Sequence, residues 1–111
     1  MNWVMLTSID QLQQIKETSS QRPQIIYKHS TRCGISSVVL RRLEKTDAPE
    51  NADYYFLDLI KHRDISNQIA ETFKVHHESP QILLIKDGDC VFEDSHYSIS
   101  MDDITEQLAS L

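Results

Sequence analysis

The chain has 111 residues, which is enough for one compact domain over residues 1–111 but too few for two. Its net charge of −6 argues against nucleic acid or an anionic membrane as the main partner, because both attract basic proteins. The longest aliphatic run, 82–85, is too short to span a membrane, and the first residues lack the basic and apolar regions of a secretory signal. We therefore expect a cytoplasmic protein whose two cysteines stay reduced.

The first two-thirds of the chain alternate predicted strands and helices. The helices have apolar residues at one-turn spacing, and the strands are short apolar runs typical of strands buried on both faces. In chain order the pattern predicts a short strand at 3–6, a helix at 9–18 capped by Ser8, a strand at 24–28, a helix from Gly34 to Lys45, a strand at 54–60 and a helix at 65–73 capped by Asp64. A strand, helix and strand in succession favour parallel pairing with a right-handed crossover.

The last third of the chain changes character. Asp87-Gly88 is a strong hairpin-turn signal, so the predicted strand at 81–86 should return antiparallel at 90–92. A last helix follows, capped by Ser100, and its buried face is expected to consist of Ile104, Leu108 and Leu111. This order of elements predicts an α/β protein with a central mixed β-sheet flanked by helices.

Cys33 is the most informative residue, because it lies where the predicted strand 24–28 gives way to the helix that begins at Gly34. The first N–H groups of a helix have no intrahelical partner and the helix dipole adds positive charge, so a thiolate is favoured there. Arg32 adds a cation next to the sulfur. Such surroundings are typical of a reactive cysteine. Ser36 stands where a C-x-x-C motif has its second cysteine, so this is a one-thiol site whose thiolate the Ser36 hydroxyl can hydrogen-bond.

Ser79-Pro80 lies just before the predicted strand 81–86. A proline there is ordinary for the start of a strand, but the predicted sheet brings it close to Cys33. This arrangement and the Cys33-x-x-Ser36 spacing resemble the thioredoxin superfamily, in which an X-Pro pair with a cis bond faces the reactive cysteine. The resemblance implies a thioredoxin-like fold in which Ser79 and Pro80 bind substrate, because the backbone before the proline can pair with an incoming peptide.

Within that superfamily the chain is most similar to the monothiol bacilliredoxins, small bacterial proteins of the bacillithiol system. The matching segments are Lys28-His29-Ser30, Cys33-x-x-Ser36, Tyr54–Leu59 and Glu78–Gln81. The resemblance implies that Cys33 removes bacillithiol, a low-molecular-weight thiol, from S-thiolated proteins without a bound cofactor. A second small thiol or a partner reductase would then regenerate Cys33. The chain has Arg32 and Gly34 where members of the family often have Thr and Pro.

Two alternatives stay open. Residues 33–36 are also similar to the Cys-Gly-Phe-Ser signature of monothiol glutaredoxins, which hold a 2Fe–2S cluster between two protomers with glutathione. The chain lacks the Gly-Gly-Asp segment with which that family holds the tripeptide, since 92–96 contains no glycine. The second alternative is a non-catalytic module that keeps the fold and binds a partner across the surface around Cys33 and Pro80, because fold alone does not establish function.

The remaining cysteine and the five histidines have structural interpretations. Cys90 follows the hairpin turn and is expected to pack as an ordinary strand residue. The histidines lack the paired spacing and cysteine partners of a metal site, so no metal is predicted. We expect His29 to face outward near the site, and His76 and His77 to be exposed in the loop before Pro80.

Overall fold

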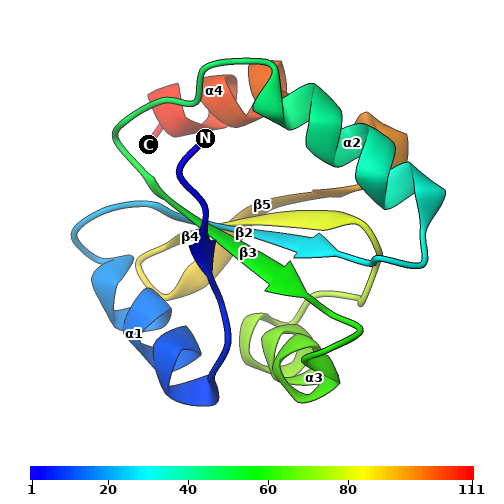
Figure 1. Cartoon of the computed structure of the whole chain (residues 1–111). Helices are drawn as coiled ribbons and strands as arrows, with labels where there is room; N and C mark the ends of the chain where they lie inside the picture. The colour runs from blue at the N-terminus through cyan, green and yellow to red at the C-terminus, as the bar shows by residue number, and fades with distance from the viewer.

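The computed structural model describes residues 1–111 and contains one five-stranded sheet with helices on both faces (Figure 1). The elements are β1 (Val4–Met5), α1 (Ile9–Thr18), β2 (Gln24–His29), α2 (Gly34–Glu44), β3 (Asp53–Asp58), α3 (Arg63–Phe73), β4 (Gln81–Lys86), β5 (Asp89–Ser95), the short 3-10 helix η1 (His96–Ser98) and α4 (Met101–Ala109). None of the helices combines the length and apolar character that crossing a bilayer requires.

The sheet has the strand order β1-β3-β2-β4-β5. Strand β3 is parallel to both β1 and β2, whereas β4 is antiparallel to both β2 and β5. The mixed sheet predicted from the order of elements is therefore confirmed. Strand β2 is at the centre of the sheet and all of its residues are buried, which explains its continuous apolar run.

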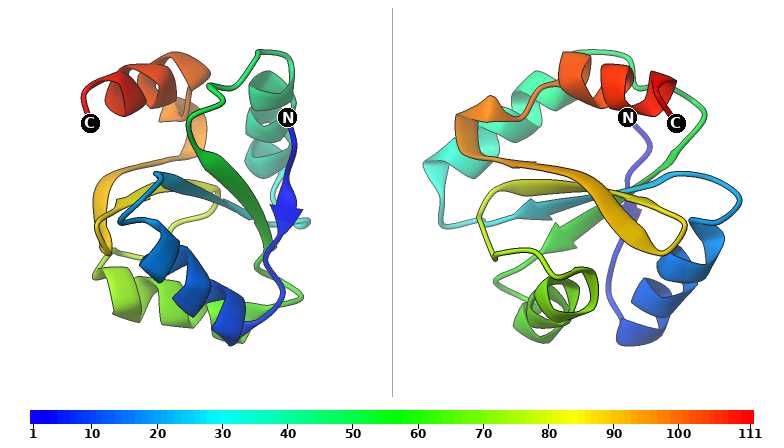
Figure 2. Two further views of the ribbon diagram at one scale, coloured as in Figure 1. Left: turned by 90° about the vertical axis from the view of Figure 1, so that its left-hand side faces the viewer. Right: turned by 180° about the vertical axis from the view of Figure 1, so that it is seen from behind.

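Helices α2 and α4 cover one face of the sheet, and α1 and α3 cover the other (Figures 1 and 2). Successive side chains of a strand point to opposite faces, so β2 contributes to two separate cores. Ile25 and Tyr27 pack in the core beneath α2 and α4, while Ile26 packs in the core against α1 and α3.

Three local signals in the sequence correctly predicted boundaries: two serine helix caps and one hairpin turn. The Ser8 hydroxyl oxygen accepts a hydrogen bond from the Gln11 N–H at 3.1 Å, and that of Ser100 caps α4 in the same way. Asp87 and Gly88 have φ values of 54° and 81°, as the two-residue turn of a tight hairpin requires. Both helix starts and the hairpin are set by residues within a few positions of the boundary.

The junction between β3 and α3 differs from the prediction. A carboxylate oxygen of Asp58 accepts hydrogen bonds from the N–H groups of Ile60 and Lys61, each at 3.2 Å, and so turns the chain before the predicted strand end. The N-cap of α3 is His62, and Asp64 lies in the first turn of the helix instead of capping it. At that place its negative charge still complements the helix dipole.

The C-terminal end differs as well. Leu111 lies beyond α4 and is 52% exposed, so it does not belong to the buried face assigned to it. Met101 at the start of α4 is buried with Ile104 and Leu108 instead. Helix α4 ends at Ala109, so its buried face does not extend to the last residue of the chain. The sequence pattern also gave no sign of η1, which connects β5 to α4.

Candidate active site

Cys33 is the N-cap of α2, with an extended backbone (φ −111°, ψ 115°) directly after the loop that leaves β2. Its N–H donates to the carbonyl oxygen of Ser30 at 3.2 Å, and its carbonyl accepts from the N–H of Ser37 at 3.4 Å. The side chain is partly buried and makes no capping hydrogen bond. The backbone therefore fixes the residue at the helix N-terminus, as predicted, while the sulfur is not engaged in capping.

Ser36 holds the loop before Cys33 in place. Its side chain is fully buried, and its hydroxyl oxygen accepts a hydrogen bond from the Ser30 N–H at 3.0 Å. The carbonyl of Ser36 accepts from the Tyr27 hydroxyl at 2.8 Å. Burial raises the pKa of Tyr27 to about 12, so this phenol remains a donor at neutral pH. The serine at the resolving position thus has a structural partner of its own.

Arg32 and Gly34, the two residues that flank Cys33, are both exposed. The guanidinium of Arg32 takes part in none of the ion pairs of the structure, so its charge is not neutralised by a carboxylate. A side chain added at Gly34 would meet no atom within 4 Å. The space beside Gly34 is therefore open, and a larger residue could replace the glycine without a clash.

The Ser79–Pro80 peptide bond is cis, as the resemblance implied. The pairing of β2 with β4 ends at Lys28 opposite Gln81, so Pro80 follows on beside His29, four residues before Cys33. The start of β4 and the start of α2 lie at the same end of the sheet, at the right in Figure 1. The fold thus brings together the two features that the sequence separates by almost half its length.

A third segment, η1, borders the same end of the sheet. The His96 N–H donates to the carbonyl oxygen of Pro80 at 3.1 Å, and its imidazole lies 3.3 Å from a carboxylate oxygen of Glu78. Helix α2 also contacts η1. His96 has a φ of 56°, which is uncommon for a residue other than glycine. No pattern in the sequence indicated that this residue joins the site region.

His29 does not face outward as expected. Only 7% of the residue is exposed, and its ring packs 5.2 Å from that of Phe56 and 6.1 Å from that of Tyr27. Burial lowers the pKa of His29, which keeps the imidazole neutral at pH 7, and its Nδ1 has no hydrogen-bond partner. His29 is the last residue of β2 and, two positions after Tyr27, points to the same face of the sheet, which α2 covers. The predicted outward orientation of His29 is therefore wrong.

The predicted exposure of the loop histidines is confirmed for both, but His77 also makes a contact that the sequence did not predict. His76 and His77 are both exposed, but the imidazole Nδ1 of His77 lies 2.7 Å from the ammonium nitrogen of Lys28. Lys28 itself is fully buried in β2. Sequence reasoning missed this contact, since it joins residues 49 positions apart.

Cys90 lies at the other end of the sheet. It pairs with Ile85, which pairs with Gln24 at the start of β2, and the five residue steps of β2 at about 3.3 Å each separate that end from His29 by roughly 17 Å. Its side chain packs against the core beneath α1 and α3, and burial raises the pKa of its thiol to about 11. A disulfide needs Cα atoms within about 7 Å, so Cys90 is not placed to pair with Cys33.

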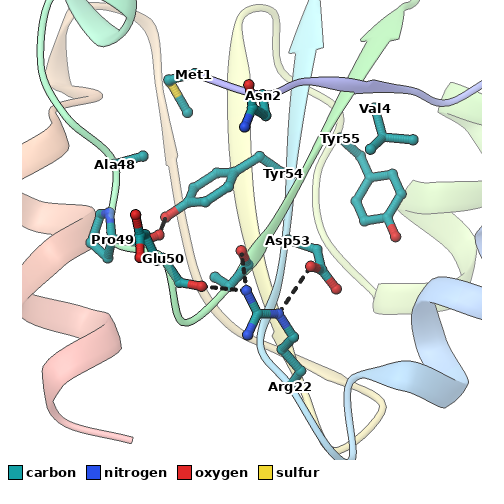
Figure 3. Close-up of a pocket in the computed structure, with 11 residues that line it drawn as sticks. Met1, Asn2, Val4, Arg22, Ala48, Pro49, Glu50, Asp53, Tyr54 and Tyr55 are labelled. Atoms are coloured by element: carbon teal, nitrogen blue, oxygen red, sulfur yellow. Dashed lines mark hydrogen bonds and ion pairs between the residues drawn. The ribbon is translucent and has the colours of Figure 1, made fainter.

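The largest concavity, about 620 Å³, is lined by residues just before β2 and at the start of β3, at the end of the sheet away from Cys33. Figure 3 shows the residues that line it. Its charged groups are engaged with one another: Arg22 donates to the carboxylate of Asp53 at 2.9 Å and to the carbonyls of Glu50 and Ala52. No cluster of three or more His, Cys, Asp or Glu side chains could hold a metal ion in the structure. The thiol at the N-terminus of α2, that of Cys33, lies at the opposite end of the sheet.

Comparisons with known proteins bear on the fold and the family of the chain. The family model described as monothiol bacilliredoxin BrxC matches residues 4–104. A solved structure with a thioredoxin fold, provisionally described as an oxidoreductase, has 30% sequence identity and a TM-score of 0.80, and the match covers 93% of this chain and 90% of that chain. Thioredoxin from Malassezia sympodialis has 20% identity and a TM-score of 0.73, covering 98% and 90%. Thioredoxin from Schistosoma mansoni has 14% identity and a TM-score of 0.73, covering 99% and 95%. The thioredoxin-like fold is thereby confirmed.

Proposed function

The chain belongs to the monothiol bacilliredoxin family and is a thiol oxidoreductase, and we propose that it removes bacillithiol from mixed disulfides on proteins through Cys33. One observation carries this proposal. The thiol at the N-terminus of α2 lies at the end of the sheet where Pro80 begins β4, while the chain's other thiol packs at the opposite end. A site of this kind can form one mixed disulfide but cannot resolve it internally.

The proposed reaction is a thiol–disulfide exchange. The Cys33 thiolate attacks the bacillithiol sulfur of a protein–bacillithiol disulfide, whose S–S bond breaks as a new S–S bond to Cys33 forms. The protein sulfur leaves as a thiolate and takes up a proton from solvent. The substrate cysteine is thereby reduced, and Cys33 is oxidised to its bacillithiol adduct.

A second exchange completes the cycle. Another bacillithiol thiolate, or a thiolate of a partner reductase's dithiol, attacks the bacillithiol sulfur of the adduct, whose S–S bond to Cys33 breaks and releases Cys33 as a thiolate. The product is bacillithiol disulfide or, with the reductase, a mixed disulfide that its second thiol resolves to an intramolecular disulfide and free bacillithiol. Ser36 cannot perform this step because a hydroxyl does not displace a disulfide, and its oxygen already accepts the hydrogen bond from Ser30. The low-molecular-weight thiol is thus a co-substrate in this proposal, and no cofactor is needed.

The proposal also assigns roles to the residues around the sulfur. Ser79 and Pro80 would offer backbone groups to the protein part of the substrate, in the manner of strand addition. Arg32, with its unpaired charge, would favour the thiolate, and Gly34 leaves the approach to the sulfur open. These roles are testable by substitution without disturbing the core, since Arg32 and Gly34 are exposed.

The proposal is tested by steady-state turnover of one model protein carrying either bacillithiol or glutathione on the same cysteine. With free bacillithiol as the regenerating thiol, the oxidoreductase should remove bacillithiol from the model protein faster than it removes glutathione. If neither adduct is cleared, or if the glutathione adduct is cleared faster, the proposed substrate is wrong. Anaerobic reconstitution with iron, sulfide and each thiol provides the contrast, because a stable coloured dimer would favour the 2Fe–2S carrier instead.

A further inference from the structure

Lys28 is a buried charged residue that the proposed reaction does not use. It lies near the end of the central strand β2 with none of its surface exposed, which is rare for lysine unless its charge is paired. None of the ion pairs in the structure includes it. Its ammonium nitrogen instead lies 2.7 Å from Nδ1 of His77 and 3.0 Å from the side-chain oxygen of Gln81.

Gln81, the first residue of β4, extends this contact along the loop. Its side chain is fully buried and its amide oxygen also accepts from the Glu78 N–H, at 3.4 Å. Its amide nitrogen donates to the carbonyl of His76 at 2.9 Å and to a carboxylate oxygen of Glu93 at 3.0 Å. Three consecutive loop residues, 76 to 78, are therefore bonded to Lys28 or Gln81, immediately before Ser79-Pro80.

We propose that Lys28 is a positioning residue for the proposed reaction. Through His77 and Gln81 it holds loop 76–80 against the strand that leads into Cys33, and so fixes the distance between the sulfur and the backbone that receives the substrate. This inference rests on the proposed function, which supplies the reaction that the loop serves. Lys28 acts through the loop and does not touch the substrate.

Directed hydrogen bonds explain a lysine at this place better than stability does. The pKa of Lys28 is lowered to about 8, chiefly by burial; nearby Glu78 acts in the opposite direction and Arg63 in the same direction as burial, so the charged form is less favoured than in water. An apolar residue of similar size would pack as well without that penalty. It would lack the N–H donors that His77 and Gln81 accept.

His77 fits the role of acceptor. Burial, Lys28 and Arg63 all lower the pKa of His77, so its imidazole is neutral at pH 7 and Nδ1 can accept from the ammonium. The Ser66 hydroxyl of α3 lies 3.3 Å from the same nitrogen. The contact therefore joins the loop to both β2 and α3.

The test compares Lys28→Met with Gln24→Met. Gln24 is a matched control because it is also fully buried on β2 and hydrogen-bonded, but at the end away from Cys33. Three quantities are measured for each variant and the wild type: kcat and KM for a bacillithiolated protein, the rate of Cys33 alkylation by iodoacetamide, and hydrogen exchange of the Glu78 N–H.

For Lys28→Met we expect kcat/KM to fall by about tenfold or more, because a misplaced binding element costs that much without any change in the reacting groups. Alkylation of Cys33 should stay near the wild-type rate, since a small reagent needs no loop, and exchange at Glu78 should accelerate. Gln24→Met should leave all three quantities near wild type. Unchanged kcat/KM and unchanged Glu78 exchange in Lys28→Met would overturn the proposal, as would an equal loss of activity in both variants.

His77→Ala provides a second variant in case Lys28→Met does not fold. His77 lies in a loop and the residue as a whole is exposed, so folding should not depend on its imidazole. The substitution should lower kcat/KM and accelerate Glu78 exchange, as Lys28→Met does. Wild-type activity in both variants would overturn the proposal. If the wild type itself clears no thiol adduct, the proposed function fails, and Glu78 exchange still decides whether Lys28 holds the loop.

Discussion

The two ends of β2 have similar residues in different surroundings. Each end has one cysteine nearby and, on β2 itself, one fully buried amide or ammonium side chain: Cys33 with Lys28 at one end, Cys90 with Gln24 at the other. Cys33 lies at a helix N-terminus beside an open surface, whereas Cys90 is packed in a strand with a raised thiol pKa. The position in the fold, rather than the residue type, distinguishes a candidate nucleophile from a packing residue.

The polar side chains differ in the range of their contacts. Gln24 donates to the Asp53 carboxylate on the adjacent strand and to the carbonyls of Arg22 and Pro23 next to it. All of its partners therefore lie at its own end of the sheet. Lys28 instead reaches His77, which is 49 positions away in the loop before Pro80. The Gln24 end of β2 is hydrogen-bonded to adjacent residues and the adjacent strand. The Lys28 end is hydrogen-bonded to the loop that, in the proposed function, contacts the substrate.

The largest difference should appear when the two thiols are removed. Cys33→Ser should lower turnover of the bacillithiol adduct by about a thousandfold or more, because no other group can form the mixed disulfide. Cys90→Ala should leave turnover near wild type and lower stability by only about 1 kcal/mol, as for a small buried side chain. Turnover assays with urea unfolding of both variants check this. Equal losses of activity would contradict the contrast between the two ends.

The thiols should also differ in their reaction with iodoacetamide. With a pKa of about 11, only about one Cys90 in ten thousand is a thiolate at pH 7, and the labelling rate of the folded protein should rise about tenfold per pH unit up to pH 9. Cys33 should be labelled at least about a hundredfold faster at pH 7. Peptide mass spectrometry over a pH series measures both rates. Similar rates at the two sites would remove the physical basis for choosing Cys33.

The difference in stability between the wild type and Lys28→Met should depend on pH. The pKa of Lys28 is about 8 in the folded chain and 10.5 in an unfolded one, so between these values the unfolded state binds more protons and stability rises with pH. The penalty of the buried charge is therefore fully present below pH 8. Lys28→Met should be as stable as wild type or more stable by about 1–4 kcal/mol at pH 7, and the difference should shrink toward pH 10. Urea unfolding at pH 7 and pH 9.5 tests this, and a difference independent of pH would refute it.

Ser36 should matter for stability more than for chemistry. Ser36→Ala leaves the buried Ser30 N–H without its acceptor, which should lower the free energy of unfolding by about 1–3 kcal/mol. Turnover should remain measurable, because the hydroxyl exchanges no bond in the proposed mechanism. Loss of activity as complete as in Cys33→Ser, with the variant still folded, would show that Ser36 takes part in the reaction.

The two glycines provide the smallest contrast between the ends. Gly34 is the first residue of α2 with open space beside it, so Gly34→Ala should raise stability by about 0.5–1 kcal/mol. Gly88 has a φ of 81° in the hairpin turn, so Gly88→Ala should lower stability by about 1 kcal/mol. Thermal unfolding of the two variants side by side is sufficient. Shifts of the same sign would show that one of these backbone assignments is wrong.

Much of the fold was predictable because its signals are local. Ser8, Ser100 and Asp87-Gly88 act on backbone groups within three positions, and the junction at Cys33 follows from a strand pattern that meets a helix pattern. The Asp58 turn was missed because a single side-chain contact ended the strand inside a continuous apolar run.

The candidate site was predictable only in part. Cys33, Ser36 and Pro80 lie where spacing and strand order placed them, whereas the burial of His29 could not be inferred. When a strand is buried on both faces, the sequence does not show whether a polar residue at its end points into a core or toward solvent. The partners of Lys28 depend on how a distant loop crosses β2, and no local pattern encodes such a contact.

The most direct test of the central claim is a single turnover without free bacillithiol. Wild-type protein is mixed with a slight excess of a bacillithiolated substrate, acid-quenched, digested without reductant and analysed by mass spectrometry. The account predicts one bacillithiol on the Cys33 peptide, none on the Cys90 peptide, and one substrate thiol released for each adduct formed. A Cys33–Cys90 disulfide, or bacillithiol on Cys90, would contradict it.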